Sequence, residues 1–134
     1  CNIHDNMLTS NTTVGASYGI YTSGIVRGRI KRNTTRDFVN NHYFFDGVQS
    51  DVLLENPDHN AASEALLWGF GGTLSGTLVC RNIMMPTDAA PTVGNWAVNS
   101  EVKNPVPTAG GFAGRICTTA GTPGTWKTYG AVSA

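Results

Sequence analysis

The chain repeats one short pattern, reading CNIHDN at 1–6, GRIKRN at 28–33, DVLLEN at 51–56 and TLVCRN at 77–82. Each copy ends on an asparagine and carries an aliphatic residue three positions earlier. Successive asparagines are 27, 23 and 26 residues apart, which is the length of one coil in a solenoid. The repeat therefore predicts stacked β coils whose aliphatic column faces a shared core.

Three columns of this alignment carry specific predictions. The expected core column is Ile3, Ile30, Leu53 and Val79. The asparagines should stack at successive corners, because an Asn side chain can bond to its neighbouring copy and tolerates left-handed backbone; they are Asn6, Asn33, Asn56 and Asn82. The residues just before them alternate in charge, which predicts one column with a cross-coil ion pair: Asp5, Arg32, Glu55 and Arg81.

The composition and the positions of turn-forming residues predict the fold class and the division of the chain into segments. Sixteen Gly and few helical runs favour an all-β chain. Runs rich in aromatic and aliphatic residues at 19–21, 42–45 and 65–68 read as the strand that precedes each repeat. We expect the last three to four coils of a right-handed parallel β-helix over 1–85, a linker with two prolines over 86–94, and a small β cap and trimerisation module over 95–134.

Charge and hydropathy exclude several partners. Nine basic and nine acidic residues leave no net charge, so nucleic acid is not an expected partner. The apolar runs are far shorter than the roughly 20 residues that a membrane helix needs, so membrane insertion is not expected. The three cysteines, Cys1, Cys80 and Cys117, fit neither a disulfide framework nor a zinc site. A chain that opens on Cys1 also reads as a piece of a longer protein.

The positions beside the expected core column predict assembly. If that column faces inward, its neighbours face outward, and in the last coils these neighbours are apolar: Val52, Leu54, Leu78 and Cys80. An exposed apolar patch marks an interaction surface. Either the cap or an adjacent subunit covers this patch, and we expect a homotrimer that buries both the patch and the open solenoid end.

The tail GGFAGRICTTAGTPGTWKTYG at 110–130, with Trp96, Asn104–Pro105 and Pro107 upstream, resembles a short terminal module. That module follows the β-helix in phage tailspikes, tail fibres and related pectate-lyase-like bacterial proteins, and it often has Trp where this chain has Arg115. The resemblance implies a homotrimer on the virion that contacts other tail proteins and binds, and often cleaves, bacterial surface polysaccharide. It suggests an extracellular structural and receptor-binding part, with a polysaccharide depolymerase as the alternative.

Candidate site residues follow from the chemistry of sugars. Sugar rings stack on Trp and Tyr, so Trp96, Trp126 and Tyr129 are candidates for carbohydrate binding, with core packing as the alternative role. Glycoside cleavage needs two carboxyl groups about 5 to 9.5 Å apart, and Asp46 and Asp51 could approach each other across a corner, or be solvated turn acids. The histidines His4, His42 and His59 show no metal-ligand spacing, so no metal or other cofactor is expected.

Overall fold

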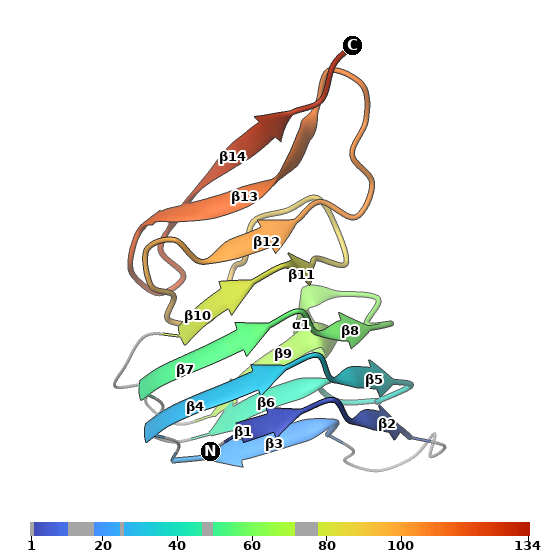
Figure 1. Ribbon diagram of the computed structural model, residues 1–134, viewed down its shortest axis with the longest axis vertical. Coiled ribbons are helices and arrows are strands. Elements are labelled where there is room, and N and C mark those ends of the chain that lie inside the picture. The colour runs from blue at the N-terminus through green and yellow to red at the C-terminus, as the bar shows by residue number, and fades with distance from the viewer. Residues whose placement is uncertain (1, 11–17, 25, 47–49, 72–77) are drawn as a thin grey trace.

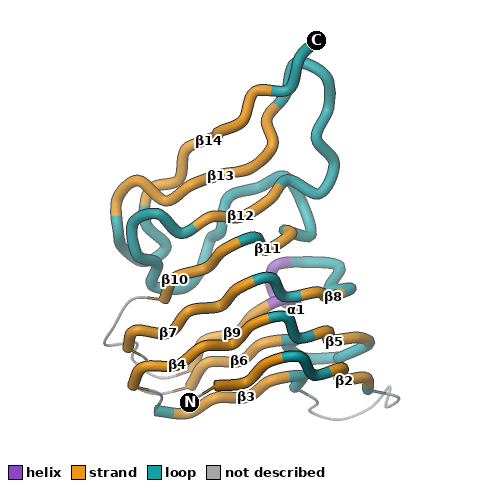
Figure 2. The backbone as a smooth tube through the Cα atoms, in the orientation of Figure 1, coloured by secondary structure: helices purple, strands orange, loops and turns teal. Residues whose placement is uncertain are grey.

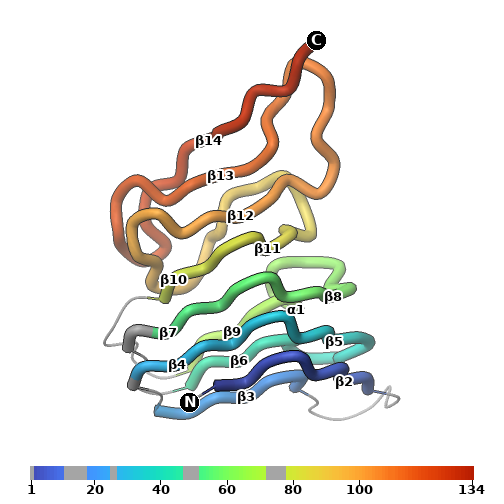
Figure 3. The backbone as a smooth tube through the Cα atoms, in the orientation of Figure 1, coloured from blue at the N-terminus to red at the C-terminus, as the bar shows by residue number. Residues whose placement is uncertain are grey.

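The protein is a stack of parallel β coils with a small mixed sheet at one end (Figure 1). The computed structural model describes residues 2–10, 18–24, 26–46, 50–71 and 78–134. The two ends of the chain lie at opposite ends of the stack (Figure 3). The all-β class and the coiled arrangement predicted from the repeat are confirmed.

Three coils of similar build form the described stack. The first coil contains β1 (Asn2–His4), β2 (Met7–Thr9) and β3 (Ile20–Ser23). The second contains β4 (Val26–Lys31), β5 (Thr34–Arg36) and β6 (Tyr43–Asp46). The third contains β7 (Ser50–Glu55), β8 (Asp58–His59), the helical turn α1 (Glu64–Leu67) and β9 (Trp68–Gly71). The fourth begins with β10 (Leu78–Arg81).

Equivalent strands of successive coils pair in parallel and form three sheets. The first sheet has the order β1-β4-β7-β10, the second β2-β5-β8 and the third β3-β6-β9. Figure 2 shows these strands as layers that run along the stack. The strand predicted at 65–68 is wrong over most of its length, because α1 occupies it and β9 starts only at Trp68. Ser63 stands at the N-cap of this turn, and Glu, Ala and Leu are good helix formers.

The core column differs from the predicted one in the third and fourth coils. Ile3 pairs with Ile30, Ile30 pairs with Leu54, and Leu54 pairs with Cys80. The register between the second and third coils is thus one residue longer than the spacing of the asparagines. A one-residue slip in a strand moves every side chain to the opposite face. The prediction of Leu53 and Val79 as core residues is therefore wrong.

The same slip removes the predicted apolar patch. The four residues expected to face outward are at most 1% exposed and lie in the core of the coils: Val52, Leu54, Leu78 and Cys80. They are buried by the chain itself and need no partner to cover them. The argument for a homotrimer from these positions is wrong.

The corner between the first and second sheets has left-handed backbone in every coil. The φ values are 58° at Asp5, 51° at Arg32, 47° at Asn56 and 53° at Asn82. Asn56 and Asn82 therefore stack with each other, while Asn6 and Asn33 stack one position later. The predicted stacking is therefore confirmed for Asn6 with Asn33 and for Asn56 with Asn82, and it is wrong for Asn33 with Asn56.

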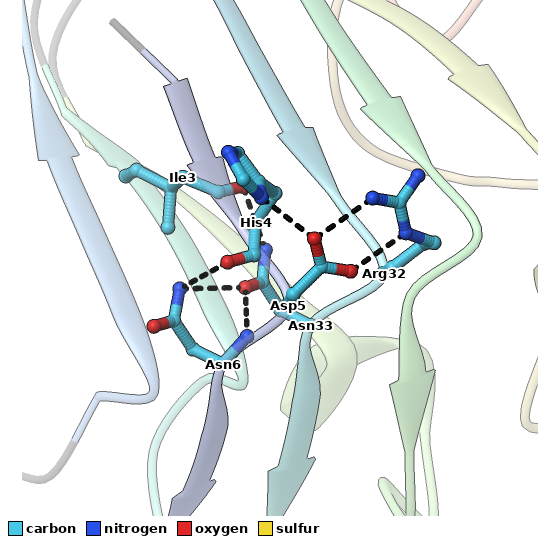
Figure 4. A network of polar contacts seen from close by, with 6 residues as sticks. All are labelled: Ile3, His4, Asp5, Asn6, Arg32 and Asn33. Carbon is cyan, nitrogen blue, oxygen red and sulfur yellow. Dashed lines mark hydrogen bonds and ion pairs between the residues drawn. The ribbon is translucent and has the colours of Figure 1, made fainter.

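The first corner is held by a polar network (Figure 4). Asn33 is 1% exposed. Its Nδ2 donates to the Ile3 carbonyl at 2.9 Å, and its Oδ1 accepts from the Asn6 backbone N–H at 3.1 Å and from Asn6 Nδ2 at 3.0 Å. Beside it, Arg32 Nε and Nη2 donate to the two Asp5 carboxylate oxygens at 2.6 and 2.8 Å. The network ties the first coil to the second.

The charge column is confirmed within two pairs and broken between them. Asp5 and Arg32 form the predicted cross-coil ion pair. Glu55 aligns with Arg81, as predicted, but in the second coil it aligns with Lys31 and not with Arg32. The one-residue register difference again divides the predicted column into two.

The residues predicted as a linker close a fourth, shorter coil. After β10 come β11 (Ile83–Met84) and the segment 86–94, and the chain then returns beside β10. Trp96 bridges Leu78 in parallel, and the Leu78 N–H donates to the Asn95 carbonyl at 2.7 Å. Next, β12 (Glu101–Lys103) pairs in parallel with β11, so the cap sheet grows out of this coil.

The cap completes the end of the stack. Strands β13 (Phe112–Thr119) and β14 (Thr125–Ala131) form an antiparallel hairpin, and β13 pairs with β12. One buried cluster runs from the coils into the cap and includes Trp68, Trp96 and Cys117. In the part of the chain that the structure describes, no helix could span a membrane.

Candidate functional site

The outer face of the third sheet carries three aromatic rings in contact. Tyr21 of β3 pairs with Phe44 of β6, and their rings are 5.4 Å apart and nearly parallel. The Tyr18 ring lies 4.9 Å from the Phe44 ring and 5.7 Å from the Tyr21 ring. Because side chains alternate along a strand, the flanking Ile20 and Thr22 point inward and are buried. We call Tyr18, Tyr21 and Phe44 the aromatic platform.

The platform is accessible and held in place. Tyr21 lies on β3, the edge strand of the third sheet, and is 51% exposed. Its hydroxyl donates to Asp46 Oδ2 at 2.6 Å. This hydrogen bond raises the pKa of Tyr21. The phenol ring is thus fixed with one face available, as a stacking surface for an apolar ligand face requires.

Asp46 is one of the two predicted catalytic acids. Its partner in the structure is the Tyr21 hydroxyl, which gives it a role in orienting the platform. The side chain of Asp51, the other candidate, lies outside the described residues. The catalytic prediction for this pair remains untested.

Two glycines of β9 give room for Phe44 of the platform and for the neighbouring Asn41 and Asp46. A Cβ on Gly69 would come within 2.5 Å of Asn41 Oδ1 and 2.7 Å of Phe44 Cδ2. A Cβ on Gly71 would come within 2.6 Å of Asp46 Oδ1. The backbone of β9 therefore forms a floor over which Phe44, Asn41 and Asp46 lean, and other residues would displace them.

A cavity adjoins the platform at Gly69. Its volume is about 520 Å³, and it opens between the third coil, the segment 86–94 and a turn of the cap. Its walls are mostly apolar, with one amide and two hydroxyl groups: Asn41, Ala65, Trp68, Gly69, Phe70, Thr92, Val93, Gly94 and Thr122. Concave apolar sites with a few polar groups are where small ligands bind.

Glu64 holds one wall of the cavity in place. Its carboxylate accepts from the Thr92 backbone N–H at 2.8 Å and from the Thr92 hydroxyl at 2.7 Å. It also accepts from Trp68 Nε1 at 3.0 Å. On the opposite side, Asn41 Nδ2 donates to the Ala65 carbonyl at 2.7 Å. These bonds fix the cavity without a ligand.

Of the three aromatic residues predicted to bind carbohydrate, Trp96 and Trp126 lie in contact at the junction of coils and cap, and Tyr129 lies elsewhere in the cap. Trp96 is completely buried at the junction of coils and cap, with the Trp68, Phe70 and Trp126 rings 5.0, 6.0 and 6.3 Å away. A ring so enclosed has no face to offer to a sugar. Trp126 is half-buried, and its Nε1 donates to the Pro123 carbonyl at 2.9 Å.

Tyr129 lies elsewhere in the cap, in a cluster with two charged residues. Lys103 Nζ donates to the Tyr129 hydroxyl at 2.7 Å and forms an ion pair with Glu101 at 2.6 Å, while the hydroxyl also donates to Glu101. Lys103 further lies 5.1 Å from the centre of the tyrosine ring. This half-buried cluster braces β12 against β14, and a role in sugar binding remains untested.

Arg115 takes the place that Trp often has in the module that the tail resembles. Its guanidinium carbon lies 4.6 Å from the centre of the Phe112 ring. Its Nε and Nη2 both donate to the Asp88 carbonyl, at 3.1 and 2.8 Å. The arginine thus packs the segment 86–94 against the cap.

Other reactive groups form no site. Among the residues that the structure describes, no group of three or more His, Cys, Asp or Glu side chains could hold a metal ion. Burial raises the pKa of the Cys80 thiol to about 12, so it stays protonated. The rings of His42, which is buried, and His59, which is half-buried, meet edge to face at 5.9 Å, and burial lowers the pKa of each.

Sequence reasoning placed the platform residues in or beside predicted strands and gave them no function. The signal was available in the alternation of β3, where Tyr21 occupies an outward position between two inward ones. Comparisons with family models, with curated proteins and with solved structures each find no match to this chain. The geometry of the site is therefore the basis for a functional proposal.

Proposed function

We propose that this chain is the structural and receptor-binding end of a virion tailspike or tail fibre, and that it binds polysaccharide on the bacterial surface through the third sheet. The observation that carries the proposal is the platform of Tyr18, Tyr21 and Phe44, whose rings are in contact and of which Tyr21 is exposed and the other two are half-buried. The C–H face of a sugar ring stacks well on such rings. The resemblance of the tail at 110–130 to the terminal module of tailspikes supports the same function.

The build of the site suits an extended polymer. Strands of the third sheet stack along the length of the β-helix, so the platform and the adjoining cavity follow one another along its side. A chain of sugars can contact both at once, and the contacts then act together. Weak individual contacts combine in this way into useful affinity.

The alternative, a polysaccharide depolymerase, has less support. Cleavage would require a second carboxyl group at a suitable distance from Asp46. Asp46 is hydrogen-bonded to Tyr21, an arrangement that favours binding. No second function is therefore proposed for this face.

Assembly remains part of the proposal. A homotrimer located in the virion, in contact with other tail proteins, would bring three platforms to one receptor surface. Light scattering on the purified chain measures the number of subunits. A folded monomer would remove the trimer from the proposal, and the binding site within one chain would stand.

Binding is tested with a panel of purified lipopolysaccharide O-chains and capsular polysaccharides immobilised on a biosensor. We expect at least one of them to bind the wild-type chain. Tyr21→Ala should weaken that binding at least tenfold, because the exposed ring is lost. Tyr21→Phe keeps the ring and should stay within about threefold. Absence of binding across the panel, or equal binding by Tyr21→Ala, would refute the proposal.

A further inference from the structure

We infer that the cavity beside the platform binds an uncharged, N-acetylated sugar unit of the polysaccharide and discriminates against acidic sugars. This inference rests on the proposed function and adds the class of ligand. It is carried by three observations: the size of the cavity, the chemistry of its walls and the charge around it.

The cavity is large enough to take a neighbouring sugar or a substituent of the stacked sugar. A volume of about 520 Å³ lies within the range of roughly 300 to 1,000 Å³ typical of small-molecule sites. The cavity begins at Gly69, directly beside Phe44. A sugar stacked on the platform can therefore place its neighbour, or its own substituent, in the cavity.

The walls match an acetamido group. The apolar part contains Ala65, Phe70 and Val93, which can enclose a methyl group. The polar part contains the Asn41 amide together with the side chains of Thr92 and Thr122. One Asn41 N–H is donated to Ala65 and the Thr92 hydroxyl is donated to Glu64. The second Asn41 N–H and the Thr122 hydroxyl can still donate to the acetamido C=O, and the Thr92 oxygen can accept from its N–H. A plain hydroxyl would leave the apolar wall uncovered.

The charge around the cavity opposes an anion. None of the described residues that line the cavity is Lys or Arg. The Glu64 carboxylate accepts hydrogen bonds from Thr92 and Trp68 of the wall. A carboxylate or phosphate on the ligand would lose its water and meet this negative charge without a cationic side chain among these wall residues.

Ligand-observed and tryptophan-fluorescence titrations test the inference with free sugars. The probes are N-acetylglucosamine, N-acetylgalactosamine and N-acetylmannosamine, each against its parent hexose, with glucuronic acid and N-acetylneuraminic acid as the acidic probes. We expect at least one N-acetylhexosamine to bind, with its acetyl methyl receiving the strongest saturation transfer. Its parent hexose and both acids should bind at least tenfold more weakly. Trp68 in the cavity wall provides the fluorescence signal.

A matched pair of variants locates the site. Ala65 is exposed and lines the cavity, so Ala65→Phe should fill it and abolish binding of the N-acetylhexosamine. Ala62 is equally exposed and does not line the cavity, so Ala62→Phe should bind like the wild type. Both positions are on the surface, and circular dichroism checks that both variants fold.

The outcomes separate this inference from the proposed function. Polysaccharide binding that depends on Tyr21, without binding of any N-acetylhexosamine, would overturn the inference and leave the proposed function intact. Equal binding of the acidic sugars, or wild-type binding by Ala65→Phe, would also overturn it. Loss of polysaccharide binding altogether would instead refute the proposed function.

Discussion

Replacing Asn33 by alanine should lower the free energy of unfolding far more than replacing an exposed asparagine of the same repeat. The side chain is buried and makes three hydrogen bonds, to the Ile3 carbonyl and to the backbone and side chain of Asn6. Each such bond contributes a net of about 1 kcal/mol, and a buried group left without a partner costs about 1 to 3 kcal/mol. We therefore expect the free energy of unfolding to fall by about 2 to 4 kcal/mol.

The matched control is Asn56→Gly, in the same repeat. Asn56 is exposed and has φ of 47°, a conformation that glycine adopts at no steric cost. This change should alter stability by less than about 0.5 kcal/mol. Urea unfolding followed by circular dichroism measures both variants. Equal losses for Asn33→Ala and Asn56→Gly would refute the reasoning that only the first asparagine pair forms a buried network.

Three further predictions concern pH, the cavity wall and the platform. Acid should destabilise the fold: burial lowers the pKa of His42 to about 4 and also lowers that of His59, so the unfolded chain binds these protons first as pH falls below about 6.5. The free energy of unfolding measured with urea should fall between pH 6.5 and 4, by roughly 3 kcal/mol from His42 alone, and His42→Gln should flatten this dependence. Glu64→Gln should speed hydrogen exchange of the Thr92 amide that Glu64 now accepts from; an unchanged rate would mean that the carboxylate does not hold the wall. Gly69→Ala should displace the Phe44 ring, seen as altered ring-current shifts of the platform protons, and wild-type shifts would contradict the close approach.

The stack of coils could be predicted from the sequence because every coil of a solenoid needs the same types of residue at equivalent positions. Each coil needs an inward aliphatic residue and a corner residue that accepts left-handed backbone, so the pattern recurs at the period of the coil. The ion pair between Asp5 and Arg32 was predictable for the same reason, since both residues occupy equivalent corners.

The register between the second and third coils could not be predicted in this way. Aligning Asn33 with Asn56 is the natural reading of the sequence, yet Arg32 is the residue that shares the corner conformation of Asn56. The choice depends on which alignment buries the larger apolar side chains. The free energy gained by burying Val52 and Leu54 exceeds that of stacking Asn33 on Asn56.

The candidate site shows the same division. The resemblance of the tail at 110–130 implied a sugar-binding virion protein, and the stacking of sugars on aromatic rings made Trp96 a candidate contact. Local sequence by itself determined most of the strands and the outward position of Tyr21, because these depend on alternation and on residue type. Only the tertiary structure decided that Trp96 is enclosed between coils and cap while Tyr18, Tyr21 and Phe44 meet on one face. The physical reason is that the packing of rings depends on which coils become neighbours, and that is fixed by register and burial over the whole stack.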